Sequence, residues 1–258
     1  MRLTVFCIII VMLLPSLGGK AQERSVATQV GIGAANTLDT YLSPEKYRGT
    51  EWRMQSEVRR DGTSHPSLTF ALTHEAAFAY THNRALSGHQ YAGHYDFSYA
   101  AMRRWDLLDN ALHLYAGAMT DAMIGFAYNT HNGNNNPAQG YGSLTVGAHL
   151  AAKYSFTLFN KSITVGYEAR YPMFGLMFSP NYGQSYYEIF SRGNYDRNIT
   201  AIMPDVFQLR QQLTVDVPVG KSTSVRLGYL NDIRQAKPNN LKQHHYYNGL
   251  IMGVVISK

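Results

Sequence analysis

Residues 144–157 read LTVGAHLAAKYSFT, and their side chains alternate in character along the whole stretch. One parity runs from Leu144 to Phe156 and is apolar, while the other runs from Thr145 to Thr157 and is polar or small. Because successive side chains of a β-strand point to opposite faces, this pattern predicts a strand with one apolar and one polar face. Strands of soluble proteins usually have five or six residues, whereas a tilted strand of about ten can cross a bilayer. The stretch therefore predicts a transmembrane β-strand.

Alternating segments of this kind recur along the chain. They lie at 25–36, 51–59, 67–80, 91–99, 111–128, 144–157, 163–171, 184–191, 206–217, 223–233 and 244–257. This count is odd, whereas single-chain bacterial barrels have an even number of strands, and residues 195–203 are the best candidate for one more. With that strand, short turns fall on the periplasmic side and long loops outside. We therefore predict an all-β fold, a closed antiparallel transmembrane β-barrel of about 12 strands, since an open edge would be costly in lipid.

The N-terminus has the layout of a secretory signal peptide. Arg2 is followed by an apolar run from Leu3 to Leu17 and then by small residues up to Ala21. A spanning helix needs about 20 apolar residues, so this run is short for a membrane anchor. We expect cleavage after Ala21, which makes 1–21 the signal peptide and 22–258 a single barrel domain. The only cysteine, Cys7, would leave with the signal, so the mature chain would form no disulfide.

Charge and aromatic content agree with a membrane barrel. The formal net charge of +6 falls to about +4 when Arg2 and Lys20 leave with the signal peptide. The basic residues are dispersed, so we expect no nucleic-acid partner. The 19 tyrosines suit the aromatic girdles of a barrel. We expect a place in the cell outer membrane of a Gram-negative bacterium. The partners would be the lipid bilayer with its lipopolysaccharide and the barrel-assembly machinery that inserts the chain.

Four segments carry a family resemblance. They are YLSPEKYRG at 41–49, NTHNGNNNP at 129–137, FSPNYGQSYYE at 178–188 and RLGY at 226–229. Together they resemble an uncharacterised family of outer-membrane β-barrel proteins that is common in Bacteroidetes, over nearly all of the mature chain. The resemblance implies a barrel and an outer-membrane location. It implies no activity and no catalytic residues.

The polar parity of the predicted strands is rich in charge. The residues expected to face the lumen are Glu51, Arg53, Glu57, Arg59, His94, Asp96, Lys153, Glu168, Arg170, Glu188, Arg210, Asp216 and Arg226. Both signs are mixed, and buried charges are tolerated when they are paired. We therefore expect a largely filled, ion-paired lumen, with a selective pore or a ligand cavity as the alternative.

The predicted outer loops are rich in Asn, Gly and Pro. The candidate residues in them are Tyr41, Ser43, Pro44, Asn129, His131, Asn132, Asn134, Pro137, Ser179 and Pro180. Asn and Gly tolerate left-handed backbone angles and Pro restricts φ, so these residues favour structured turns. Amide side chains also offer both donors and acceptors, which leaves open a site for glycan or lipid headgroups.

Enzymatic and metal chemistry have weaker support. Outer-membrane phospholipases and lipid A deacylases place a His-x-Ser pair near the outer leaflet, but His65 and Ser67 fall in a predicted periplasmic turn. His131 has no serine two residues on. His244 and His245 are adjacent and would point to opposite faces of a strand, so we predict no metal site and no cofactor. We expect a non-enzymatic structural or surface-interaction barrel, with a small-solute pore and a lipid hydrolase as alternatives.

Overall fold

The computed structural model describes residues 24–62, 65, 67–130, 137–202 and 207–257. The predicted signal peptide lies outside the described residues. The elements in chain order are β1 (Arg24–Asp39), β2 (Ser43–Asp61), β3 (Leu68–His82), β4 (His89–Leu107), β5 (Leu112–Asn129), β6 (Ala138–Leu158), β7 (Lys161–Phe178), α2 (Tyr186–Phe190), β8 (Ile199–Ile202), β9 (Leu209–Pro218), β10 (Thr223–Ala236), η1 (Pro238–Asn240) and β11 (Gln243–Ser257). Among the described residues, no helix has the length and apolar character needed to cross a membrane.

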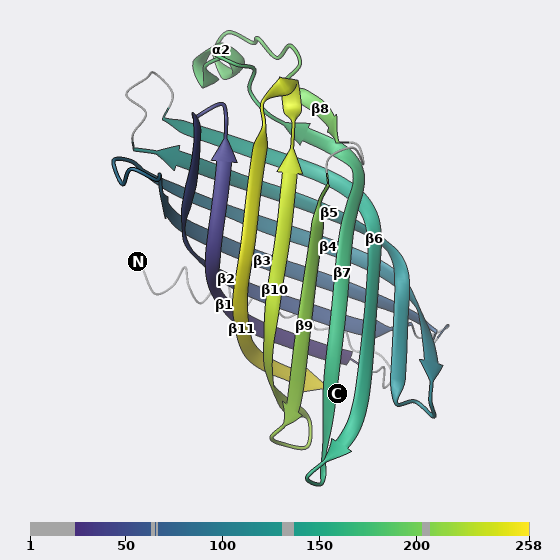
Figure 1. The fold of residues 1–258 in the computed structure, drawn as a ribbon. Coiled ribbons are helices and arrows are strands. Elements are labelled where there is room, and N and C mark those ends of the chain that lie inside the picture. Colours follow the sequence, from purple (N-terminus) through teal and green to yellow (C-terminus); the bar gives the residue numbers. More distant parts are fainter. Residues whose placement is uncertain (1–23, 63–64, 66, 131–136, 203–206, 258) are drawn as a thin grey trace, which may run out of the picture.

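Ten of the strands form a closed antiparallel ring (Figure 1). Strands β1 to β7 pair in chain order, β7 pairs with β9, and β10 and β11 follow. The ring closes where β11 pairs with β1 along their whole length, from Ser25 opposite Ser257 to Asp39 opposite Gln243. Closure gives each of the ten ring strands a partner on both sides, so the predicted closed antiparallel β-barrel is confirmed.

The two ends of the barrel differ in their connections. We call the end that carries α2 the outer end, and the end that holds Arg24 and Ser257 the inner end (Figure 1). At the inner end, β6 and β7 are joined by Phe159 and Asn160 alone. At the outer end, 179–198 connects β7 to β8 and includes α2. Short inner turns and long outer loops are the usual asymmetry of outer-membrane barrels.

The prediction of about 12 strands is wrong. Segment 184–191 was expected to be a strand but contains α2, whose N-cap Ser185 forms a capping box with Glu188. These local hydrogen bonds satisfy backbone groups that a strand would leave for its neighbours. Among the described residues 195–202, only β8 is a strand; it lies outside the ring and pairs with the outer end of β7 at Gly175–Phe178. Residue 203 lies outside the described residues. Eleven strands were counted from the sequence. The ring has the even number ten because 184–191 is not a strand, and no twelfth strand joins the ring.

The barrel is apolar outside and polar inside, as the alternation predicts. On β6, Leu144 is 58% exposed, whereas the neighbouring Thr145 is 3% exposed. The same contrast separates Leu150, which is exposed, from His149, which is buried. The apolar face suits lipid, and the polar side chains must therefore find partners within the barrel.

Candidate functional site

Arg53 stands at the centre of a charged cluster in the lumen. Its Nη1 lies 2.6 Å from Asp232 Oδ2 and 3.0 Å from Glu75 Oε1, and its Nε lies 2.5 Å from Glu51. These four side chains are each at most 2% exposed. They come from β2, β3 and β10, so the contacts run across the interior. Such pairing compensates charges that would otherwise be costly to bury.

Two further arginines extend this group. Arg210 holds the Glu75 carboxylate with contacts of 2.6 Å and 2.5 Å. Arg234 lies 2.5 Å from Asp96 and 3.0 Å from Asp232. The outer cluster, as we call it, consists of Glu51, Arg53, Glu75, His94, Asp96, Arg210, Asp232, Arg234 and His245, whose ring hydrogen-bonds Glu51.

A second cluster lies closer to the inner end. Arg59 is 3.0 Å from Glu57 and 2.8 Å from Glu168, and Arg170 is 3.1 Å and 2.6 Å from the same two carboxylates. His149 Nε2 lies 3.3 Å from Glu168. This inner cluster, Glu57, Arg59, His149, Glu168 and Arg170, joins β2 to β6 and β7. Two arginines and two glutamates balance each other in charge.

The structure brings twelve of the thirteen predicted lumen residues into the interior. Nine belong to the two clusters, Asp216 and Arg226 pair at 2.7 Å, and Lys153 lines a small cavity beside the inner cluster. Glu188 is a correction. It lies in α2, where the backbone N–H and the hydroxyl of Ser185 donate to its carboxylate at 2.7 Å and 3.1 Å. These hydrogen bonds lower the pKa of Glu188 below its usual value.

Several lumen residues were missed by sequence reasoning. They are Glu75, Asp121, His149, Asp232, Arg234 and His245. The alternation of inward and outward side chains could have identified most of them. On β10, for example, Asp232 and Arg234 lie an even number of positions after the inward-facing Arg226 and therefore face the same way. Glu75 likewise lies opposite the apolar parity of 67–80, which His74 interrupts.

The outer half of the lumen holds a cavity. About 130 Å³ of it is open to the centres of water molecules. Its wall includes Asp39 and Tyr141 towards the outer end and Asp96, Asp121 and Arg234 further in. Seven residues of the outer cluster line this cavity, namely Glu75, His94, Asp96, Arg210, Asp232, Arg234 and His245.

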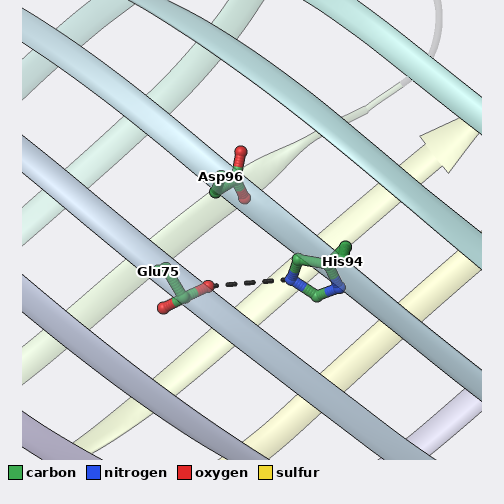
Figure 2. Close-up of side chains that lie close together, drawn as sticks. All are labelled: Glu75, His94 and Asp96. Carbon is green, nitrogen blue, oxygen red and sulfur yellow. Dashed lines mark ion pairs between the residues drawn. The ribbon is translucent and has the colours of Figure 1, made fainter. Parts of the chain in front are cut away.

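Glu75, His94 and Asp96 lie together in the cavity wall (Figure 2). Glu75 on β3 is directly opposite Asp96 on β4 in the strand register, and His94 is two residues from Asp96 on the same face. One ligating atom from each side chain lies within 4.8 Å of the others. No metal site was predicted from the sequence, yet these three side chains converge.

His244 and His245 lie on opposite faces of β11, as expected. His245 hydrogen-bonds Glu51, while His244 stacks on Tyr246.

The predicted outer-loop residues occupy separate places. Asn129 is buried and donates to the Tyr47 hydroxyl at 2.9 Å, and its backbone N–H donates to Pro137 O at 2.8 Å. Ser179 and Pro180 are buried after β7, while Ser43 and Pro44 begin β2. His131, Asn132 and Asn134 lie outside the described residues. The described candidates therefore form turns and packing contacts rather than one site.

Residues 179–198 form a compact segment at the outer end, the cap segment (Figure 1). Hydrogen bonds of the Gln184 side chain hold it together. The amide nitrogen donates to Asn194 O at 2.9 Å, and the amide oxygen accepts from the Asn198 side chain at 2.7 Å. Tyr41 donates to Gln184 O at 2.7 Å, and Tyr186 donates to Gly140 O at 3.0 Å. The cap segment is thus tied to the β1–β2 connection and to β6. The Ser185-x-x-Glu188 spacing is the sequence signal that could have revealed its helix.

The His-x-Ser pair that was considered as a hydrolase site lies at the inner end, as expected from the sequence. His65 and Ser67 are exposed in the β2–β3 connection at the inner end. An outer-leaflet ester would therefore lie at the opposite end of the barrel.

The closed ring, its apolar exterior and its ion-paired interior define the class: a transmembrane β-barrel of the outer-membrane type. A family model described as a protein of unknown function, DUF3316, matches residues 5–257. The chain belongs to this family. The predicted resemblance to a family without an assigned function is therefore confirmed. A Bacteroidetes origin stays a prediction.

Comparison with solved structures shows the barrel fold. The outer membrane protease OmpT from Escherichia coli has a TM-score of 0.52 and 8% identity, covering 94% of this chain and 99% of that one. The translocator domain of the autotransporter NalP from Neisseria meningitidis has a TM-score of 0.45 and 10% identity, covering 99% and 94%. At such identity the OmpT likeness shows the barrel fold alone. A search of the curated proteins finds no match.

Proposed function

We propose that this protein is a non-enzymatic, non-conducting outer-membrane barrel with a structural or surface-interaction role. The observation that carries the proposal is the Arg53 guanidinium, which meets carboxylates from three strands in the middle of the lumen. A solute on its way through would have to separate these pairs and leave buried charges uncompensated, at several kcal/mol each.

The two clusters lie one after the other along the lumen, so a solute would have to pass both. The outer cluster joins β2, β3, β4, β9, β10 and β11, and the inner cluster joins β2, β6 and β7. Gln29 donates to Gln55 and Gln212, both at 3.1 Å, and adds a further bridge across the interior. A narrow barrel can fill its interior with side chains, whereas an open pore arranges its charges around water. The paired, buried charges favour the filled interior.

The exterior and the fold support the proposed location. The exposed apolar residues of the strands suit an outer-membrane bilayer, and the predicted signal peptide would export the chain through the inner membrane of a Gram-negative bacterium. The barrel-assembly machinery would insert it, and lipopolysaccharide would surround its outer half. The cap segment would then face the outside, where its exposed aromatic residues Tyr182, Tyr187 and Phe190 offer a surface for partners.

Single-channel conductance of the refolded mature chain in planar bilayers tests the closed lumen. Heat-modifiable gel mobility shows that the barrel is folded, and a porin in the same bilayers shows that the assay detects pores. A folded barrel that stays silent supports the proposal. Reproducible conductance steps would overturn it and establish the small-solute pore, the second candidate, which the outer cavity favours.

A further inference from the structure

We propose that the wall of the outer cavity binds one divalent metal ion through His94, Asp96 and Glu75. This goes beyond the closed-lumen function, since the site would fill whether or not the lumen conducts. One imidazole nitrogen with carboxylate oxygens suits first-row ions such as Mn²⁺, Co²⁺ and Zn²⁺. Waters in the cavity would complete the coordination shell, as they do in open metal sites.

The backbone already places the donors together. Asp96 and His94 are alternate residues of β4 and share its inward face, and Glu75 faces Asp96 from β3 (Figure 2). Their ligating atoms lie within 4.8 Å of one another. Metal bonds of about 2.0–2.2 Å bring ligand atoms to about 3–4 Å from each other, so small side-chain rotations complete the site. Strands hold such side chains more firmly than loops do.

Two of the donors have buried atoms without a hydrogen-bond partner among the described residues. His94 Nε2 and Asp96 Oδ1 are buried and make no hydrogen bond, although each residue is only 7% exposed. His94 Nε2 lies 3.8 Å from Glu75, which is too long for a hydrogen bond. A buried polar atom left unsatisfied is destabilising, because it has lost its hydrogen bonds to water without replacing them. A bound cation would satisfy the imidazole nitrogen and the carboxylate oxygen at once.

Carboxyl groups outnumber guanidinium groups around the site. The carboxyl groups are Glu51, Glu75, Asp96, Asp121 and Asp232, and the guanidinium groups facing them are Arg53, Arg210 and Arg234. Arg170 approaches from the inner side but is held by Glu57 and Glu168, and His245 is engaged by Glu51. The carboxyl groups outnumber the facing guanidinium groups by two, although Glu51, Glu75, Asp96 and Asp232 each contact at least one arginine. Asp121 lies beside Asp96 and makes no ion pair among the described residues.

Arginines beside the site hold the carboxylates without filling it. Arg234 contacts Asp96 through Oδ2 at 2.5 Å, which leaves Oδ1 free. Glu75 is shared with Arg53 and Arg210, so it would be the weakest of the three ligands. Glu75 and Asp96 face each other directly, and like charges in that position repel unless a cation lies between them. Arg234 lies 2.5 Å from Asp96 and 3.7 Å from Glu75, so it offsets part of this repulsion, and a metal ion would offset the rest.

The test is metal binding by the full mature chain, refolded in detergent and freed of metal. Zn²⁺ is measured by equilibrium dialysis, and Co²⁺ by the visible absorption that nitrogen and oxygen coordination produces. We expect one ion per barrel. His94→Gln and Asp96→Asn should each weaken Zn²⁺ binding by at least the roughly 10–100-fold that loss of an outer-shell partner causes, and remove the Co²⁺ absorption, because each removes a ligand. His149→Gln is the matched control, a buried lumen histidine outside the site, and it should bind like the wild type.

Heat-modifiable mobility establishes that each variant is folded, and either of the two ligand variants is sufficient if the other does not fold. The absence of saturable binding by the wild-type barrel would overturn the proposal. So would unchanged binding by a folded His94→Gln or Asp96→Asn barrel, or equal loss in His149→Gln. Conductance is measured separately, so failure of the metal site and failure of the closed lumen are distinguished.

Discussion

Arg53 on β2 and Asp232 on β10 are 2.6 Å apart, although β1 and β11 separate their strands in the ring. The pair is therefore made through the lumen and not between neighbouring strands. The Tyr247 ring on β11 lies under the same guanidinium, with the Arg53 Cζ 4.1 Å from its centre. A single side chain thus links the walls of the barrel at mid-height.

Replacing Arg53 with Met should destabilise the barrel. The variant leaves Glu51, Glu75 and Asp232 short of a counter-charge, and breaking a buried pair by removing one partner costs about 3–5 kcal/mol. Denaturant unfolding followed by gel mobility measures the loss. Arg48→Met, at an exposed position of the same strand, is the control and should change stability by less than about 0.5 kcal/mol. Equal stability of the two variants would show that the lumen pairs contribute little.

Gly33→Ala should weaken the closure of the ring. Gly33 on β1 lies opposite Gly249 on β11, and a Cβ there would overlap the Asn248 carbonyl oxygen and the Gly249 Cα. The strands must shift to make room, at about 1–3 kcal/mol. Gly220→Ala is the control, because its Cβ would meet only Thr223 at an ordinary 3.7 Å. A Gly33→Ala barrel that folds and unfolds like Gly220→Ala would contradict the close approach.

Glu188→Gln should loosen the cap segment at neutral pH. The Ser185 backbone N–H and hydroxyl lower the pKa of Glu188 by binding its ionised form. A lowered pKa in the folded state stabilises the fold above the ordinary carboxyl range, and this contribution is lost as the pH falls through the lowered pKa. Amide hydrogen exchange in 185–192 should therefore differ between variant and wild type at pH 7 and converge in acid.

Asp196→Asn is the control for this pH dependence, because Asp196 is an exposed acid of the same segment. It should exchange like the wild type at every pH. Ser185→Ala should reproduce the loosening by removing the other half of the capping box, at about 1 kcal/mol. A difference between Glu188→Gln and wild type that persists unchanged in acid would rule out the ionised carboxylate as its cause.

Tyr186→Phe should release the cap segment from β6. It removes the hydroxyl that donates to Gly140 O, worth about 0.5–1.5 kcal/mol. Burial raises the pKa of Tyr186 from 10.0 to about 12, so its contribution is present below pH 10 and is lost as the pH rises towards 12. Exchange of the cap amides reports the release. Tyr187→Phe, at an exposed neighbour, should have no effect, and an equal effect would argue against the hydrogen bond.

The sequence by itself determined which residues face lipid and which face the lumen. The alternation at 144–157 and 51–59 is a local property, because a strand turns successive side chains to opposite sides wherever it lies. Apolar lipid-facing and charged inward-facing residues could therefore be assigned before any strand was paired. The same reasoning failed at 184–191, where the local hydrogen bonds of Ser185 and Glu188 favour a helix.

Only the tertiary structure decided which inward charges meet. Arg53 and Asp232 are distant in sequence, and their contact depends on the ring order, on the stagger between strands and on the narrow interior that these produce. The number of ring strands, the ties of the cap segment to Tyr41 and Gly140, and the convergence of Glu75 with His94 and Asp96 arise in the same way. A period of two assigns a side chain to a face, whereas its partner across the lumen depends on how all ten strands close together.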